Sequence, residues 1–221
     1  MNKYKYFILL SFFLFIFSIN KCYAWVNGFS LSGKIIYLDA GHGGVDSGAI
    51  YGNIYEKDIN LILVKKLERL LTSYGAMVYL TRNGDYDLSN GSKMRKRGDL
   101  SNRAYLINNS ICDMYISIHL NYISDCRWRG VQIFYTDKNE LNNNIAKSFT
   151  DFLKKNYYNV RDYKENNTYY MYNLINKPGI LIEAGFLSNV NDRYLLTKER
   201  YQDKLVECIM GAIINFYLEK D

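Results

Sequence analysis

Histidine and cysteine are scarce in this chain of 221 residues, which contains two histidines and four cysteines. No Cys-x-x-Cys pair is present, and the three cysteines after residue 24 (Cys112, Cys126 and Cys208) are odd in number and irregularly spaced. This pattern excludes a thiolate metal site and argues against a disulfide framework. No internal repeat, low-complexity linker or second module is visible either. Any metal chemistry must therefore depend on the two imidazoles and on carboxylates.

The N-terminal stretch 1–24 has the pattern of a secretory signal peptide. Lys3 and Lys5 provide a positive start, an apolar run follows over residues 7–19, and the stretch ends in a small residue. The apolar run is too short to span a bilayer comfortably, so we predict a cleaved signal and export across the cytoplasmic membrane. An uncleaved tether, with a transient association of this segment with the membrane, is the alternative.

The rest of the chain is expected to form one domain. We assign residues 25–33 to a linker and residues 34–221 to the domain, because roughly 200 residues supply one well-packed core. Loss of residues 1–24 lowers the formal net charge from +6 to +3, since they contain three lysines and no acidic residue. So mild an excess does not indicate nucleic acid as a partner, and it suits an anionic surface such as a cell wall.

Apolar runs alternate with amphipathic segments along the domain. Nearly continuous hydrophobicity predicts buried strands at 34–39, 76–81, 113–120, 130–136 and 179–186. An apolar period near 3.6 predicts helices at about 58–74, 100–107, 145–153 and 198–218. Asp58 is expected as the N-cap of the first helix and Gly75 as its C′ residue, while residues 82–98 are expected as a polar connection. The predicted fold is α/β, a single domain with a mostly parallel mixed sheet flanked by helices on both faces.

Both histidines lie where a predicted strand ends. His42 is in the glycine-rich loop after the first strand, and His119 is at the end of the strand over 113–120. Either one alone is more simply interpreted as a hydrogen-bonded polar residue, and Glu56, at the start of the first long helix, as compensation of the helix dipole. Together they form the two-imidazole, one-carboxylate set of many hydrolytic zinc sites. Because ligands bind at the carboxyl ends of strands in such folds, we predict a Zn2+ site of His42, Glu56 and His119 there.

Glu183 places a charge inside the otherwise apolar strand 179–186. Burial of a carboxylate without a partner is unfavourable. A position facing a metal would relieve this cost and would place Glu183 as a general base. An ion pair with Arg82 or Arg103 is the alternative.

Five segments are informative because they occur together and in this order: Ile36–Ala49, Glu56 with Asn60-Leu61, Leu80–Asp85, Ser117–Asn121 and Glu183–Asn189. In these segments the chain resembles the zinc-dependent N-acetylmuramoyl-L-alanine amidases of the amidase-3 type. The resemblance implies that residues 34–221 are an amidase catalytic domain that cleaves the amide bond between N-acetylmuramic acid and L-alanine in peptidoglycan. It also implies that His42, Glu56 and His119 bind zinc and that Glu183 is the catalytic glutamate.

Two further segments, Lys96–Arg103 and Trp128–Tyr135, together with Ser117–Asn121, are most like those of the CwlD-type, germination-specific amidases. This resemblance implies removal of peptides from muramic acid in spore cortex, after which a separate deacetylase forms muramic-δ-lactam. The expected location is the cell wall or the forespore intermembrane space.

Supporting roles and other functions stay open at this point. Asp46 and Asn121 are expected to orient the metal ligands, with loop capping as the alternative. An activating protein partner is expected because no second module places the domain on its polymer. The alternative functions are a catalytically silent wall-binding or scaffold protein, another zinc hydrolase such as a carboxypeptidase, and a vegetative cell-wall autolysin.

Overall fold

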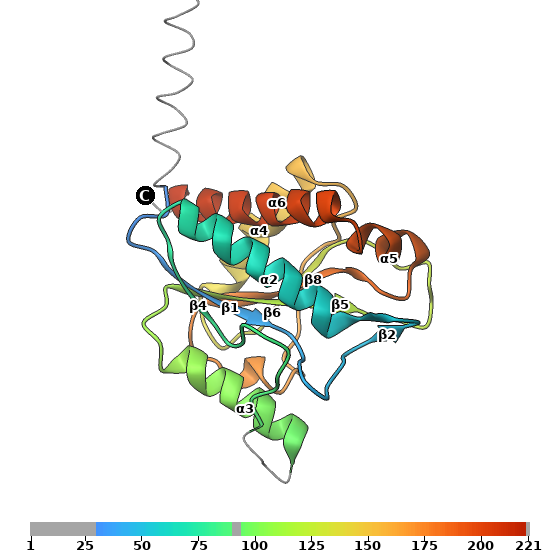
Figure 1. The fold of residues 1–221 in the computed structure, drawn as a ribbon. Helices are drawn as coiled ribbons and strands as arrows, with labels where there is room; N and C mark the ends of the chain where they lie inside the picture. Colours follow the sequence, from blue (N-terminus) through green and yellow to red (C-terminus); the bar gives the residue numbers. More distant parts are fainter. Residues whose placement is uncertain (1–29, 90–93, 220–221) are drawn as a thin grey trace, which may run out of the picture.

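The computed structural model describes residues 30–89 and 94–219, and the predicted signal peptide 1–24 lies outside them. A central sheet with the strand order β4-β1-β5-β8-β6-β7 forms the middle layer (Figure 1). Its strands are β1 (Ile35–Ala40), β4 (Met77–Leu80), β5 (Met114–Asn121), β6 (Gln132–Tyr135), β7 (Lys164–Glu165) and β8 (Gly179–Phe186). Strands β4, β1, β5 and β8 pair in parallel, whereas β6 is antiparallel to β8. The mostly parallel mixed sheet confirms the predicted fold class.

Helices cover both faces of the sheet, as predicted. Helices α2 (Glu56–Ser73), α4 (Asn142–Asn156) and α6 (Glu199–Leu218) lie on one face, and α3 (Arg95–Asn108) lies on the other with the short 3-10 helix η1 (Tyr172–Leu174) (Figure 1). A hairpin of β2 (Ile50–Tyr51) and β3 (Ile54–Tyr55) leads into α2, and α5 (Val190–Leu196) follows β8. None of the helices within 30–89 and 94–219 is long and apolar enough to cross a membrane.

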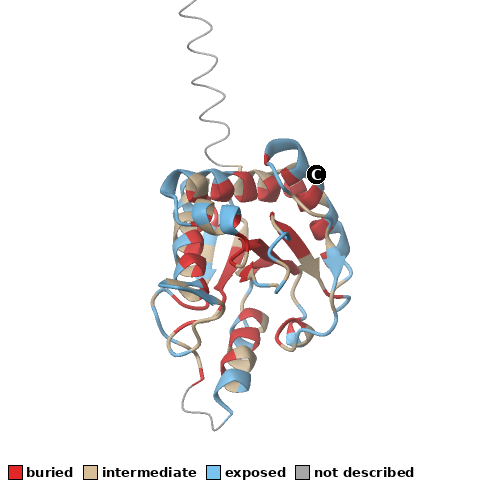
Figure 2. Cartoon of the chain, turned by 90° about the vertical axis from the view of Figure 1, so that its right-hand side faces the viewer, coloured by how far each residue is buried: buried red, intermediate tan, exposed pale blue. Residues whose placement is uncertain are grey.

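Two apolar clusters, one on each face, hold the layers together. Successive side chains of a strand point to opposite faces. Accordingly, Ile36 and Leu38 of β1 belong to the larger cluster with Leu63 of α2, and Tyr37 belongs to the smaller cluster with Ile107 of α3. The central strands are consequently the most deeply buried part of the chain, as Figure 2 shows. Such a sheet supports the side chains at the carboxyl ends of its central strands.

Several boundaries differ from those predicted. Helix α2 begins at Glu56, so Asp58 lies in its first turn and the N-cap residue is Tyr55, which makes the predicted Asp58 cap wrong. The reason is the preceding hairpin, because the Glu56 amide donates to the carbonyl of Ala49 and joins the helix directly to it. Gly75, with φ +90°, occupies the predicted C′ position, and its amide donates to the carbonyl of Thr72.

Two segments predicted as connections contain ordered structure. Helix α3 begins at Arg95, inside the expected polar connection 82–98. The apolar period does not reveal this start, because the first turn of the helix carries charged residues instead of an apolar stripe. Leu31, in the predicted linker 25–33, is fully buried in the larger core, and its amide donates to the carbonyl of Tyr74. The packed domain therefore begins upstream of residue 34.

Candidate metal centre

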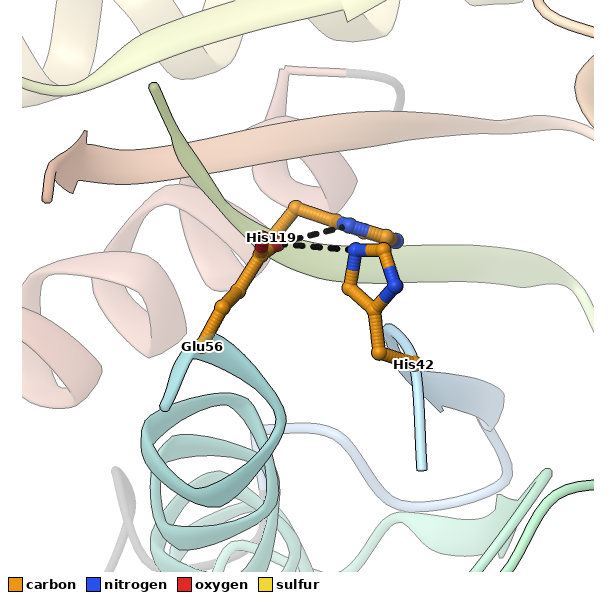
Figure 3. A group of neighbouring side chains, drawn as sticks. All are labelled: His42, Glu56 and His119. Atoms are coloured by element: carbon orange, nitrogen blue, oxygen red, sulfur yellow. Dashed lines mark hydrogen bonds and ion pairs between the residues drawn. The ribbon is translucent and has the colours of Figure 1, made fainter. Parts of the chain in front are cut away.

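Three side chains from distant parts of the sequence meet at one point (Figure 3). His42 comes from the loop after β1, Glu56 from the first residue of α2, and His119 from β5 near its carboxyl end. Glu56 Oε1 lies 3.2 Å from His42 Nε2 and 3.1 Å from His119 Nδ1. One ligand atom from each residue can be chosen so that all three lie within 4.8 Å of one another. The three predicted metal ligands are thus brought together by the fold.

The donor set and its spacing fit a zinc ion. Zinc binds imidazole nitrogen and carboxylate oxygen at about 2.0–2.2 Å in a tetrahedral arrangement, which places neighbouring ligand atoms about 3.3 Å apart. The observed 3.1 and 3.2 Å between Glu56 Oε1 and the two imidazole nitrogens are close to this spacing. Three protein ligands would leave the fourth position open, as in catalytic zinc sites.

Glu56 is held as an ionised carboxylate. The amide of Ala49 donates to Oε2 at 2.8 Å, and the amide of Leu120 donates to Oε1 at 3.0 Å. Burial alone would raise the pKa of Glu56, but the hydrogen bonds with His119 and His42 outweigh it and hold the pKa far below its usual range. The carboxylate is therefore fixed in direction and available as an anionic ligand.

Asp46 orients the His42 ring. Its Oδ2 lies 2.9 Å from His42 Nδ1, which leaves Nε2 directed at Glu56. Burial lowers the pKa of His42, but the hydrogen bonds to Asp46 and Glu56 prevail and raise it to about 9. Asn121 lines the cavity onto which the cluster opens. Its side chain makes no hydrogen bond to His42, Glu56 or His119 among the described residues, and its backbone carbonyl accepts from the amide of Leu187.

Two glycines provide the room for this cluster. A Cβ atom on Gly41 would lie 2.2 Å from the His119 ring. On Gly48, whose φ is +64°, a Cβ would lie 2.6 Å from both Glu56 Oε2 and His42 Cδ2. The glycines of the loop after β1 therefore allow the imidazoles and the carboxylate to pack directly against the backbone.

Glu183 lies beside the cluster and forms no ion pair within residues 30–89 and 94–219. It pairs in register with His119 across β8 and β5, is buried, and its Oε2 has no hydrogen-bond partner among the described residues. Arg82 and Arg103 are bound elsewhere, so the alternative ion pair with Glu183 is wrong. Burial, with a smaller contribution from the charge of Glu56, raises the pKa of Glu183 to about 8. A buried carboxyl with a pKa near neutrality can both accept and donate a proton.

A cavity of about 790 Å³ opens onto these groups. It is lined by the three clustered residues, by Glu183, and by side chains that include Lys96, Tyr169 and Tyr170. This volume is in the range of binding sites for small molecules or for a segment of a polymer. The cavity therefore brings together a His-Glu-His cluster that could hold a metal ion and a buried carboxyl group.

The residues below the cluster were not predicted as part of the site. Asp39 of β1 accepts hydrogen bonds from Thr81, Ser117 and Arg103, and Asn60 donates to Glu56 Oε1 and to the carbonyl of Gly41. The sequence shows only that Asp39 is a carboxylate at the end of an apolar strand and that arginines occur later in the chain. The partners of Asp39 lie more than 40 residues away in sequence, so no local pattern identifies them.

Known proteins support the resemblance inferred from the motifs. A sequence model of the N-acetylmuramoyl-L-alanine amidase family matches residues 36–215. The germination-specific N-acetylmuramoyl-L-alanine amidase of Bacillus subtilis (strain 168) is 43% identical over 219 residues, which cover 96% of this chain and 92% of that protein.

Solved structures show the same fold. The CwlD amidase from Clostridioides difficile, determined in complex with the GerS lipoprotein, has a TM-score of 0.79 and 38% identity, covering 86% of this chain and 100% of that one. An N-acetylmuramoyl-L-alanine amidase from Clostridium difficile 630 has a TM-score of 0.75 and 30% identity, covering 85% and 98%. Both similarities extend over nearly all of the described residues.

Proposed function

The chain belongs to the N-acetylmuramoyl-L-alanine amidase family, and we propose that it cleaves the bond between N-acetylmuramic acid and L-alanine with zinc held by His42, Glu56 and His119. The observation that carries this proposal is the convergence of three ligand atoms within 4.8 Å, in a cavity that also contains the buried Glu183. An uncharged amide resists hydrolysis, so its cleavage needs an activated water, stabilisation of the oxyanion and a proton for the leaving nitrogen.

The residues divide these tasks. When bound, zinc supplies Lewis acidity, which polarises a carbonyl and makes water more acidic. Glu183 accepts the proton of the attacking water at its unpartnered Oε2 as the new C–O bond forms. It then delivers that proton to the alanine nitrogen as the C–N bond breaks, so that a carboxyl group and a free amine are the products. Neither histidine transfers a proton, because both imidazoles are committed as ligands.

Asp46 and Asn121 assist without reacting. The Asp46 carboxylate keeps His42 Nδ1 engaged and thereby fixes which ring nitrogen faces the metal position. For Asn121 we propose a contact with the bound substrate or with His119, from its place on the cavity wall.

The biological substrate that we propose is spore-cortex peptidoglycan. Support comes from the 43% identity to a germination-specific amidase over nearly the full length of both chains. The product, muramic acid without its peptide, would then be converted by a separate deacetylase into muramic-δ-lactam. This role requires export to the cell wall or to the forespore intermembrane space, which the predicted signal at 1–24 would provide.

An activating protein partner is also part of the proposal. The similar CwlD amidase was determined in complex with a lipoprotein, which supports a protein partner for this chain as well. Zinc affinity and amidase activity of the purified protein are expected to rise when an envelope extract from sporulating cells is added. Equal values with and without the extract would argue against the partner.

The enzymatic proposal is tested by digestion of purified peptidoglycan with the zinc-loaded protein, followed by mass spectrometry. We expect peptides that begin with a free L-alanine amine and glycan with a free lactyl carboxyl group. Replacement of His42, Glu56 or His119 by Ala should remove zinc and activity together, whereas Lys147→Ala, at an exposed position, is the matched control. Trimmed stem peptides would indicate a carboxypeptidase instead, and binding without turnover would indicate a silent wall-binding protein.

The cortex assignment needs a separate test. Muropeptides from the cortex of a Glu183→Ala strain should lack muramic-δ-lactam. Lactam at the wild-type level would contradict the germination-specific role and would favour a vegetative autolysin.

A further inference from the structure

The turn that carries His42 has an unfavourable backbone conformation. His42 has φ +61°, in the left-handed region that residues with a side chain rarely adopt. Such a conformation persists only where the surrounding structure imposes it. Because this turn directs the imidazole toward Glu56, whatever holds the turn also holds a metal ligand.

Two arginine side chains hold it. The carbonyl of Ala40 accepts hydrogen bonds from Arg82 Nε at 2.9 Å and from Arg103 Nη1 at 2.6 Å. The carbonyl of Gly41 accepts from Arg82 Nη2 at 2.9 Å. The carbonyl of His42 itself accepts from Arg103 Nη2 at 2.6 Å. Three successive carbonyls are thus bound by two guanidinium groups, one from the segment after β4 and one from α3.

The burial of these arginines indicates a specialised role. Both side chains are 1% exposed. Arg103 is neutralised by Asp39 and Asp99, each at 2.8 Å, but within residues 30–89 and 94–219 Arg82 has no ion-pair partner and donates only to backbone carbonyls. Burial, and then the neighbouring charge of Arg103, lowers the pKa of Arg82. A buried cation without a counter-ion is costly. The planar fork of Arg82 donates to the carbonyls of Ala40 and Gly41 in the turn and to those of Lys57 and Gly84 beside it.

We infer that Arg82 and Arg103 are positioning residues for the metal ligand His42, and that they determine zinc affinity without touching the metal. The inference rests on the proposed function in taking zinc as the metal. A lysine keeps the charge at either position, but its single ammonium group cannot reproduce the fixed fork of donors. Substitution should therefore loosen the turn while leaving the charge of the site unchanged.

The test compares zinc affinity with stability in the full-length protein. The zinc Kd is measured by competition with a chelator, and the Tm of the metal-free protein is measured in parallel, for Arg82→Lys and Arg103→Lys. The matched controls are Thr81→Val and Ser117→Ala, which remove hydrogen bonds to Asp39 in the same buried region but none to the carbonyls of residues 40–42. Arginine variants should bind zinc about 10- to 100-fold more weakly, the range measured when groups supporting a metal ligand are removed. The zinc Kd of the controls should stay within about twofold of the wild-type value, even where their Tm falls as far as that of the arginine variants.

Two results would overturn the inference. One is wild-type zinc affinity in both arginine variants, and the other is a Kd that follows Tm equally in arginine variants and controls. A variant that is unfolded without metal is titrated with zinc, and the zinc concentration that restores its fold is compared in the same way. Absence of zinc binding by the wild type would overturn the proposed function itself, whereas a failure confined to the arginine variants would overturn only this inference.

Discussion

Asp39 in β1 and Glu183 in β8 are buried carboxylates on the two strands that flank β5, yet their surroundings are opposite in kind. Asp39 accepts hydrogen bonds from Thr81 and Ser117 and pairs with Arg103 at 2.8 Å. Burial would raise its pKa, but Arg103 outweighs this effect and lowers the pKa to about 2. Glu183 has one oxygen without a partner among the described residues, and its pKa is raised to about 8.

The different surroundings of Asp39 and Glu183 indicate different roles for the two carboxyl groups. A buried carboxylate is tolerated when it is paired and hydrogen-bonded, and it is costly when it is not. Thr81, Ser117 and Arg103 donate hydrogen bonds to Asp39, whereas no donor among the described residues binds Glu183 Oε2. Asp39 therefore stabilises the framework, whereas Glu183 has an oxygen that is available for the proton transfer proposed above.

The largest expected effect is on activity, from Glu183→Gln. The amide has nearly the same shape but cannot accept a proton, so turnover should fall by about 10²- to 10⁴-fold. Zinc content should not change, because Glu183 is not a ligand, and the free energy of unfolding should stay equal or rise. Kinetics with zinc-loaded protein measure the turnover, and urea denaturation measures the free energy of unfolding. Wild-type turnover in this variant would remove Glu183 from the mechanism.

The matching change on the other strand, Asp39→Asn, should act on stability. It leaves the buried Arg103 with Asp99 as its remaining carboxylate, and loss of one partner of a buried ion pair costs about 3 kcal/mol. Urea denaturation of the metal-free protein measures this change. Asp151→Asn, in an exposed pair with Lys147, is the control and should leave the free energy of unfolding nearly unchanged. A loss no larger than that of the control would contradict the supporting role of Asp39.

The two carboxyls should also give opposite pH dependences in the metal-free protein. The pKa of Asp39 is lowered from 3.8 to about 2, so its contribution is complete above pH 3.8 and is lost as the pH falls through about 2. The pKa of Glu183 is raised from 4.5 to about 8, so its protonated form favours folding below pH 4.5, and this contribution is lost as the pH rises through about 8. The difference in unfolding free energy between the wild type and each amide variant, measured against pH, should show these two slopes. A flat difference for Glu183→Gln would show that its pKa is not raised.

The smallest effect concerns the residues beside the ligands. Asp46→Ala removes the hydrogen bond to His42 Nδ1 and should weaken zinc binding by about 10-fold with the fold intact. Asn121→Ala, which removes no hydrogen bond to a ligand residue, should change the Kd less. Chelator competition measures both values. An unchanged Kd for Asp46→Ala would reduce Asp46 to a loop cap.

Much of the framework follows from local sequence patterns. The strand over 179–186 was predicted with the bounds that β8 has, because a continuous apolar run between polar segments is typical of a strand buried on both faces. The sequence pattern also identifies the candidate site. Both imidazoles lie where strands end, Glu56 lies at a helix start, and Glu183 is a charged residue inside an apolar strand. The convergence of these four residues in one cavity agrees with that identification.

What could not be predicted leaves no apolar pattern in the local sequence. The start of α2 is determined by the hairpin before it, and α3 begins with charged residues that carry no apolar period. Arg82, named above only as an alternative ion-pair partner of Glu183, binds the turn at residues 40 and 41, while Asp85 pairs with Lys57. No spacing rule indicates which carbonyls a buried arginine will bind.

The central claim is that His42, Glu56 and His119 hold one zinc ion next to Glu183. An anomalous difference map at the zinc edge, from crystals of the zinc-loaded protein, tests it most directly. We predict a single strong peak about 2.0–2.2 Å from one nitrogen of each imidazole and from a Glu56 oxygen, with Glu183 facing it and making no bond to it. A peak elsewhere, or none at saturating zinc, would contradict the account.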